Sequence, residues 1–119
     1  MTSIYFLLRH GEFSAFHRIA SDEIWHHYEG ATLCIYEIAP HGQLTKHLLG
    51  KDVAAGCSPA LTIAARSWFA SRVEEPGCFT LSGCTVAPGF DFEDFELAER
   101  GELVRRYPPH ERIITELTR

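Results

Sequence analysis

A histidine and a glutamate near the start of the chain have side chains suited to acid–base chemistry. His17 titrates near neutral pH and can act as a general base, and a carboxylate such as Glu23 or Asp22 can orient its ring. A carboxylate buried in a protein costs several kcal/mol unless it is paired, so Glu23 needs a partner or access to water. We therefore take His17 and Glu23 as the centre of a candidate site.

The same region raises a metal site as an alternative. Successive side chains of a strand point to opposite faces, so Glu23, Trp25 and His27 share one face. A mononuclear metal site needs three or four converging nitrogen or oxygen ligands. His17 and Glu23 supply two, and His27 is a substitute third ligand at a long distance along the strand. We predict no native metal and no other cofactor.

The composition is typical of one globular domain that does not bind nucleic acid or a membrane. The chain has 119 residues, of which 45% are hydrophobic and 23% charged. Its net charge of -5 disfavours nucleic acid and acidic membranes, since both select an excess of Lys and Arg. Its apolar stretches are shorter than the roughly 18 residues that span a bilayer. The opening residues, Met1 to Leu8, lack the basic start of a signal peptide.

The four cysteines indicate a reducing compartment. Cys34, Cys57, Cys78 and Cys84 form no Cys-x-x-Cys pair and no closely spaced quartet with histidine. We expect reduced thiols that pack as small buried hydrophobes in a cytoplasmic protein. A reactive thiol at Cys84 would need a nearby cation or a helix N-terminus, and the sequence indicates neither.

Short runs of β-branched and aromatic residues, separated by Gly and Pro, predict an all-β fold over most of the chain. The turn spacing favours an antiparallel sandwich or barrel over a parallel sheet. Hairpin tips are expected at His41-Gly42 and Pro76-Gly77. The predicted strands are Ile4–Arg9, Phe13–Ile19, Glu23–Tyr28, Thr32–Ile38, Ala60–Ala64, Trp68–Ser71 and Phe79–Ala87.

The last part of the chain has a different pattern. Leu103, Val104 and Tyr107 alternate with charges, and Ile113, Ile114 and Leu117 recur at helical spacing after a Pro-Pro pair. We predict two short helices that pack on the sheet, with Pro109 near the start of the second. The chain is then one domain, residues 1–119, with a β part over about 1–97 and a helical tail over 98–119.

Two motifs carry a resemblance to a known family. Gly11, His17, Glu23 and Gly30 fall in register with the first motif of the cupin superfamily, and the block from Gly83 to Leu97 closely resembles the "cupin five" family of small cupins of unknown function. The resemblance implies a double-stranded β-helix (cupin jelly roll) with a short C-terminal helical tail. It also implies a homodimer, and it implies no particular reaction.

The resemblance also shows where this chain departs from the family pattern. Ile19 and Phe69 occupy two positions at which cupins carry histidine ligands. The turn around Ala64 to Ser67 lacks its usual Pro and Gly, so Arg66 is strained if it takes a positive φ. Members usually carry a helix and a strand before the segment matching Thr2 to Leu8, so one edge strand is expected to be missing.

In a cupin barrel the inward strand faces form a small-molecule pocket. The residues assigned to ligand binding in that pocket are Arg18, Trp25, His27, Phe69, Ser71 and Arg72. Arg18 or Arg72 would hold a substrate anion, whereas Trp25 and Phe69 are equally typical of a plain core. The run from Phe90 to Glu96 alternates aromatic and acidic residues and is expected to flank the barrel with solvated carboxylates.

Three functional hypotheses follow. The first is a metal-independent isomerase or epimerase acting on a sugar-like metabolite, with His17 as base, Glu23 as its partner, and Tyr28 or Tyr36 as acid. It resembles metal-free sugar-nucleotide epimerases of the cupin superfamily, an analogy of fold and residue type. The second is a non-catalytic binding module that uses the same pocket. The third is a metal-dependent cupin with ligands His17, Glu23 and His27.

Overall fold

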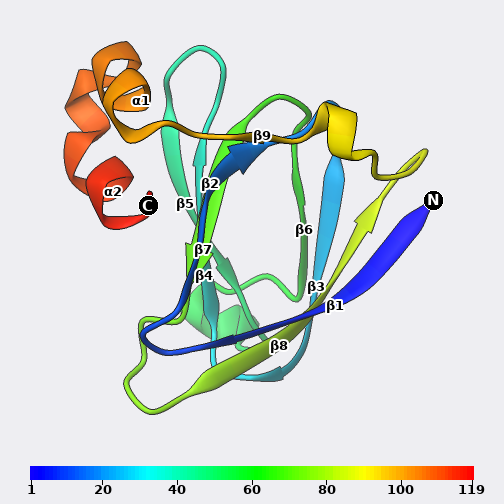
Figure 1. The fold of residues 1–119 in the computed structure, drawn as a ribbon. Helices are drawn as coiled ribbons and strands as arrows, with labels where there is room; N and C mark the ends of the chain where they lie inside the picture. Colours follow the sequence, from blue (N-terminus) through cyan, green and yellow to red (C-terminus); the bar gives the residue numbers. More distant parts are fainter.

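Two antiparallel sheets face each other and enclose the core of the protein (Figure 1). The computed structural model describes residues 1–119. The first sheet has the order β1 (Thr2–Arg9), β8 (Phe79–Val86), β3 (Glu23–Gly30) and β6 (Ala60–Ile63). The second has the order β5 (Leu44–Leu49), β4 (Leu33–Ile38), β7 (Trp68–Arg72), β2 (Phe13–Arg18) and β9 (Glu96–Leu97). Apart from β4 and β5, strands consecutive in sequence lie in opposite sheets, as in a jelly roll.

The seven predicted strands are all present, each within two residues of its expected bounds. Two further strands, β5 and β9, were not predicted. β5 is a partly exposed edge strand with Lys46 and His47 in its middle, so its residues alternate only weakly. The sequence feature that could have predicted β5 is the turn at His41-Gly42, because a hairpin needs a strand on each side of its turn. β9 is two residues long, which is too short for any periodic pattern.

The turn at Pro76-Gly77 is present, but the predicted hairpin is wrong. This turn connects β7 of the five-stranded sheet to β8 of the four-stranded sheet, so the two strands do not pair. Turn residues reverse the chain locally, whereas the pairing partner depends on which sheet needs a strand.

The apolar side chains form two clusters on opposite sides of the five-stranded sheet. One lies between the sheets and includes Trp25, Ile35 and Phe69. The other lies outside the five-stranded sheet, where Phe16 and Trp68 meet the C-terminal helices. The helical segments in that region are α1 (Arg100–Arg106), η3 (Pro108–His110) and α2 (Glu111–Glu116). The two predicted helices and the place of Pro109 before the second are confirmed.

The turn between β6 and β7 has the expected unfavourable backbone. Arg66 has φ 67°, and it is the one residue other than glycine with positive φ. The turn is held by the loop after β2, because Asp22 Oδ1 accepts a 2.7 Å hydrogen bond from Ala65 N and Ile19 O accepts a 2.9 Å bond from Arg66 N. Asp22 therefore stabilises this turn and does not orient His17.

Two remaining features concern the thiols and the membrane. Cys34, Cys57 and Cys84 are buried, Cys78 is half-buried, and none is in a disulfide, so three of the four pack as the expected small hydrophobes. A bilayer-spanning helix is absent, because none of the helices has the length and apolar character to cross a membrane.

Candidate functional site

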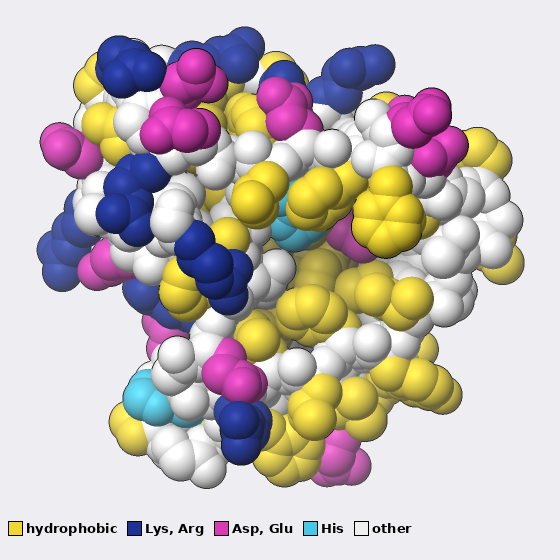
Figure 2. Space-filling model, in the orientation of Figure 1, with side chains coloured by type: hydrophobic (Ala, Val, Ile, Leu, Met, Phe, Trp, Pro, Cys, Tyr) yellow, Lys and Arg dark blue, Asp and Glu magenta, His cyan; other side chains and the backbone are white.

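A cavity of about 500 Å³ opens between the two sheets, at the end where η2 (Phe92–Asp94) and β9 cross the sandwich. Figure 2 shows it as a hollow with mostly hydrophobic walls, within which histidine and acidic surface is visible. Among its lining residues, one histidine and one acid occur, His17 and Glu23. The full lining is Thr2, Ile4, Phe6, Ser14, Ala15, His17, Ile19, Glu23, Trp25, Cys84, Val86, Phe90, Phe92, Phe95, Leu97 and Arg119.

Strand alternation explains why His17 and Glu23 meet in one cavity. β2 belongs to one sheet and β3 to the other, and the two sheets face each other. His17 is on the inward face of β2, and Glu23 and Trp25 are two residues apart on the inward face of β3. The sequence therefore identified the one histidine and the one acid of the lining, and their function stays a prediction.

The ring of His17 is oriented by a backbone carbonyl and by two phenyl rings. Its Nδ1 lies 2.8 Å from Ala15 O, and because a carbonyl oxygen only accepts, Nδ1 carries the proton. The ring centroid lies 4.2 Å from that of Phe69 and 5.3 Å from that of Phe95. Burial lowers the pKa of His17, and the bond to Ala15 opposes this only in part. Near neutral pH the ring is therefore neutral, with Nε2 as an acceptor.

Glu23 is the unusual group of the cavity. Its Oε2 is buried and has no hydrogen-bond partner, and the indole Nε1 of Trp25 is also buried without one. Burial raises the pKa of Glu23 to about 7, although the neighbouring indole N–H of Trp25 acts to lower it. Burial, with the nearby Glu23 charge, also raises the pKa of the Cys84 thiol, which therefore stays protonated. A carboxyl group in this setting can exchange a proton near neutral pH.

Aromatic side chains from three segments surround these polar groups. Phe6 of β1 meets Trp25 edge to face at 5.3 Å. After β8, the segment with Phe90, Phe92 and Phe95 folds over the opening, and Phe90 contacts both of the others. The alternation of aromatic and acidic residues predicted that this segment flanks the barrel, and the structure agrees with that prediction. That Phe90, Phe92 and Phe95 line the cavity was missed, as was the contribution of Phe6.

Tyr28 lies outside the barrel, so its predicted role as the acid does not fit this cavity. Strand alternation sets it on the outer face with His26, near which it stacks, and it contacts Tyr5 at a ring-centroid distance of 5.9 Å. Its ring covers Gly83 so closely that a Cβ there would lie 2.6 Å from the tyrosine. Gly83 is therefore required for the position of Tyr28.

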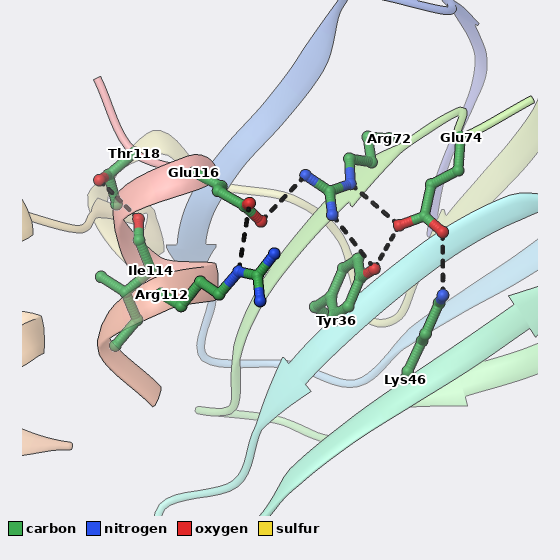
Figure 3. A network of polar contacts seen from close by, with 8 residues as sticks. All are labelled: Tyr36, Lys46, Arg72, Glu74, Arg112, Ile114, Glu116 and Thr118. Atoms are coloured by element: carbon green, nitrogen blue, oxygen red, sulfur yellow. Dashed lines mark hydrogen bonds and ion pairs between the residues drawn. The ribbon is translucent and has the colours of Figure 1, made fainter. Parts of the chain in front are cut away.

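Tyr36 and Arg72 also lie outside the cavity, on the far face of the five-stranded sheet (Figure 3). Tyr36 Oη donates a short hydrogen bond to Glu74, which also accepts from Lys46 at 2.9 Å and from Arg72 at 3.0 Å. Burial alone would raise the pKa of Glu74, but these hydrogen bonds outweigh it and lower the pKa to about 2. Arg72 continues the network to Glu116 of α2 at 3.3 Å. Both residues therefore join the sheet to the tail, and neither can contact a ligand in the cavity.

The other predicted ligand-binding residues are distributed around the cavity without lining it. Arg18 faces outward, where it binds Glu96 at 2.6 Å and covers the Trp68 ring at 4.4 Å. His27 lies further along β3, where its Nε2 is 3.0 Å from a backbone carbonyl. Phe69 and Ser71 face inward on β7 but are buried behind the wall, and Phe69 supports the His17 ring. Of the six predicted binding residues, Trp25 alone lines the cavity.

The residues of this cavity do not fit a mononuclear metal. Ile19 lines it, and Phe69 packs against His17, at the two positions where the cupin pattern has histidine. His27 does not line the cavity, so the alternative ligand set of His17, Glu23 and His27 is wrong. The protein brings together no group of three His, Cys, Asp or Glu side chains able to hold a metal ion.

Comparison with known proteins agrees with the architecture. A dTDP sugar isomerase from Desulfovibrio desulfuricans superposes with a TM-score of 0.70 at 12% identity, over 82% of this chain and 64% of that chain, a likeness that concerns the fold alone. Together with the two facing sheets and the cavity between them, this likeness agrees with a jelly roll. No curated protein matches the sequence.

The family is defined more closely by the sequence itself. Residues 1–98 match the family described as Cupin superfamily (DUF985). A protein from Shewanella oneidensis is 45% identical over 98% of this chain and 73% of its own, with a TM-score of 0.93. A hypothetical protein from Leishmania major is 30% identical over 98% and 74%, with a TM-score of 0.92. The chain belongs to this cupin family, as the block from Gly83 to Leu97 indicated.

Proposed function

We propose that the protein binds a small, largely apolar molecule in the cavity, with the polar end of that molecule at Glu23 and His17. The observation that carries this proposal is the composition of the walls. Aromatic and aliphatic side chains dominate, and the few polar ones include His17 and Glu23, which come from opposing sheets. Binding sites for small molecules typically combine an apolar enclosure with a few oriented polar groups.

Proton transfer on the bound molecule is a second candidate function. The pKa of Glu23, about 7, allows it to donate or accept a proton near neutral pH, and the neutral His17 offers a second base. An isomerase of this kind would use Glu23 and His17. The scheme of a histidine base with a tyrosine acid has no support here, because Tyr28 and Tyr36 face away from the cavity.

We also propose that the protein acts as a homodimer in the cytoplasm. The four free thiols support a reducing compartment. Exposed apolar residues on the outer face of the four-stranded sheet, including Tyr5 and Leu7, support an association between copies.

Binding is tested by a thermal-shift screen of small aromatic and aliphatic compounds that carry one polar group. A ligand should raise the melting temperature of the wild-type protein, because it binds the native state alone. Ile4→Trp places a large side chain toward the cavity and should abolish the shift. Tyr5→Trp, on the outer face of the same strand, should leave it unchanged. Equal shifts in both variants, or no ligand at all, would contradict the proposal.

Catalysis is tested separately on the compounds that bind. In D₂O, proton transfer exchanges a ligand C–H for deuterium, which NMR detects. Exchange should occur with the wild-type protein and stop in Glu23→Gln. Bound ligands that show no exchange would leave binding as the function and exclude the isomerase.

A further inference from the structure

The polar groups of the cavity define the kind of ligand that matches them. His17 Nδ1 donates to Ala15 O, which leaves Nε2 as an acceptor with no partner in the protein. Glu23 Oε2 is buried and also has no partner. When Glu23 is ionised, both side chains accept hydrogen bonds, so the matching group on a ligand is a donor with more than one N–H.

The charges point in the same direction. Glu23 is the one acidic residue of the lining, and His17 is neutral near pH 7. Arg119 is the one basic residue; its guanidinium lies 4.5 Å from the Phe13 ring centroid and donates to Phe13 O at 3.1 Å, and its charge does not act on the pKa of Glu23. A positive ligand would therefore supply the counter-charge that Glu23 lacks.

The walls are suited to the same ligand. Phe6, Trp25, Phe90, Phe92 and Phe95 all line the cavity. Aromatic faces attract organic ammonium ions through the ring quadrupole, and they also bury the apolar body that such an ion carries. A ligand anion would meet the same negative ring faces and the carboxylate, which disfavours it.

We propose that the ligand of this cavity is an organic ammonium ion, whose N–H groups bind Glu23 and His17 and whose apolar body lies among the aromatic side chains. This inference rests on the proposed binding function and names its ligand class. It differs from a neutral ligand that would accept a hydrogen bond from protonated Glu23, and the two cases respond to pH in opposite ways.

The direction of the pH dependence follows from Glu23. An ammonium ion needs the carboxylate, so its affinity should rise about tenfold for each unit of pH up to about pH 7 and level off at higher pH. The other ionisable side chains of the lining are His17 from β2, Cys84 from β8 and Arg119 from the C-terminus, whereas β1 and the segment after β8 add no ionisable group to it. Protonation of His17 would also weaken the binding of a cation at low pH. A Glu23 variant is therefore needed to separate the effect of Glu23 from that of His17.

The test compares benzylamine, which is protonated throughout this range, with benzyl alcohol and benzoate, using calorimetry on the full chain from pH 5 to pH 8. Benzylamine should bind the wild-type protein best, and its affinity should increase about a hundredfold across this range. Glu23→Gln should reduce the affinity at pH 8 by about tenfold or more and should flatten the pH profile. Glu29→Gln, on the same strand but exposed to solvent, should change neither the affinity for benzylamine nor its pH profile.

Each other outcome overturns the inference. If benzyl alcohol or benzoate binds as well as benzylamine, or if the affinity of benzylamine is constant or falls with pH, the ligand is not an ammonium ion, although the binding function stands. If none of the three probes binds while the screen finds a ligand of another class, the inference fails alone. If neither these probes nor any compound of the screen binds, the binding function fails with it. The wild-type pH profile decides the question even if Glu23→Gln does not fold.

Discussion

At the scale of single residues, Glu23 is the most informative side chain of the protein. It belongs to an apolar cavity, its Oε2 has no partner, and burial raises its pKa to about 7. A protein that served stability alone would have little reason to keep a carboxyl group there, because an uncharged residue would avoid the cost of ionising it. Groups with such pKa values are concentrated at functional sites.

The raised pKa of Glu23 predicts a specific pH dependence of stability. The folded state holds the Glu23 proton up to about pH 7, whereas the unfolded chain releases it near 4.5. The wild-type protein therefore loses stability as pH rises through this interval, relative to Glu23→Gln. A tenfold change in proton affinity corresponds to about 1.4 kcal/mol, so the difference should reach about 3 kcal/mol by pH 8.

Urea denaturation of both proteins at pH 5 and pH 8 measures this difference. The free energy of unfolding of Glu23→Gln should exceed that of the wild-type protein by a small amount at pH 5 and by a large amount at pH 8. Glu29→Gln should show no such change, since Glu29 is exposed on the outer face. An advantage of the same size at both pH values would show that Glu23 ionises as freely as in the unfolded chain.

At the scale of elements, the turn between β6 and β7 stores unfavourable backbone energy at Arg66. A left-handed conformation costs a residue with a Cβ about 1–2 kcal/mol, and glycine avoids this cost. The side chain of Arg66 is exposed and makes no hydrogen bond or ion pair with the protein. The backbone N–H groups of Ala65 and Arg66, by contrast, fix the turn to the loop after β2.

Arg66→Gly should therefore raise the free energy of unfolding by about 1 kcal/mol, although glycine also adds freedom to the unfolded chain. Arg105→Gly is the matched control, because Arg105 is an exposed residue of α1. There glycine should lower stability by about 1 kcal/mol. Chemical denaturation measures both, and a loss of stability in Arg66→Gly would show that the turn does not need a glycine-like conformation.

The C-terminal helices stabilise the five-stranded sheet from outside. Ile114 is fully buried in the outer cluster, whereas Ile113, its neighbour in α2, is partly buried. Ile114→Ala should lower the free energy of unfolding by about 3 kcal/mol, and Ile113→Ala by a clearly smaller amount. Equal losses in equilibrium denaturation would contradict the packing of α2 through Ile114.

At the scale of the whole molecule, the outer face of the four-stranded sheet is unusually apolar for a surface. Tyr5 is 80% exposed and Leu7 61%, and Ile24, Tyr28 and Phe79 are also exposed. Tyr5 and Leu7 belong to β1, whose other edge has no partner strand. An exposed apolar patch with a free strand edge is typical of a surface that another protein covers.

The expected homodimer would cover this face. Sedimentation at micromolar concentration should give twice the chain mass of 13.4 kDa, and Tyr5→Asp together with Leu7→Asp should shift it to the monomer. Val53→Asp, which changes an exposed apolar residue of η1 (Val53–Ala55), should leave the mass unchanged. A monomer in the wild-type protein would contradict the dimer, and a dimer that survives the double variant would place the interface elsewhere.

The sequence by itself determined the cupin family, seven of the nine strands, both helices, and the one histidine and one acid of the cavity. The family followed from the resemblance of its motifs. The strands and helices depend on local patterns, such as turn residues, the alternation of a strand and the spacing of a helix, which the sequence shows directly. Alternation, applied throughout, would also have excluded Arg18, Tyr28 and Arg72, because their neighbours His17, His27 and Ser71 face inward.

The tertiary structure alone decided which side chains share the cavity with His17 and Glu23. Phe6, Phe90 and Phe95 come from segments far apart in the chain, and their meeting depends on how the two sheets face each other. The tertiary structure also decided the surroundings of Tyr36, because the helical tail covers one face of its sheet and makes that face a second core. The raised pKa of Glu23 is likewise a property of its surroundings, since burial arises from packing and not from the residue.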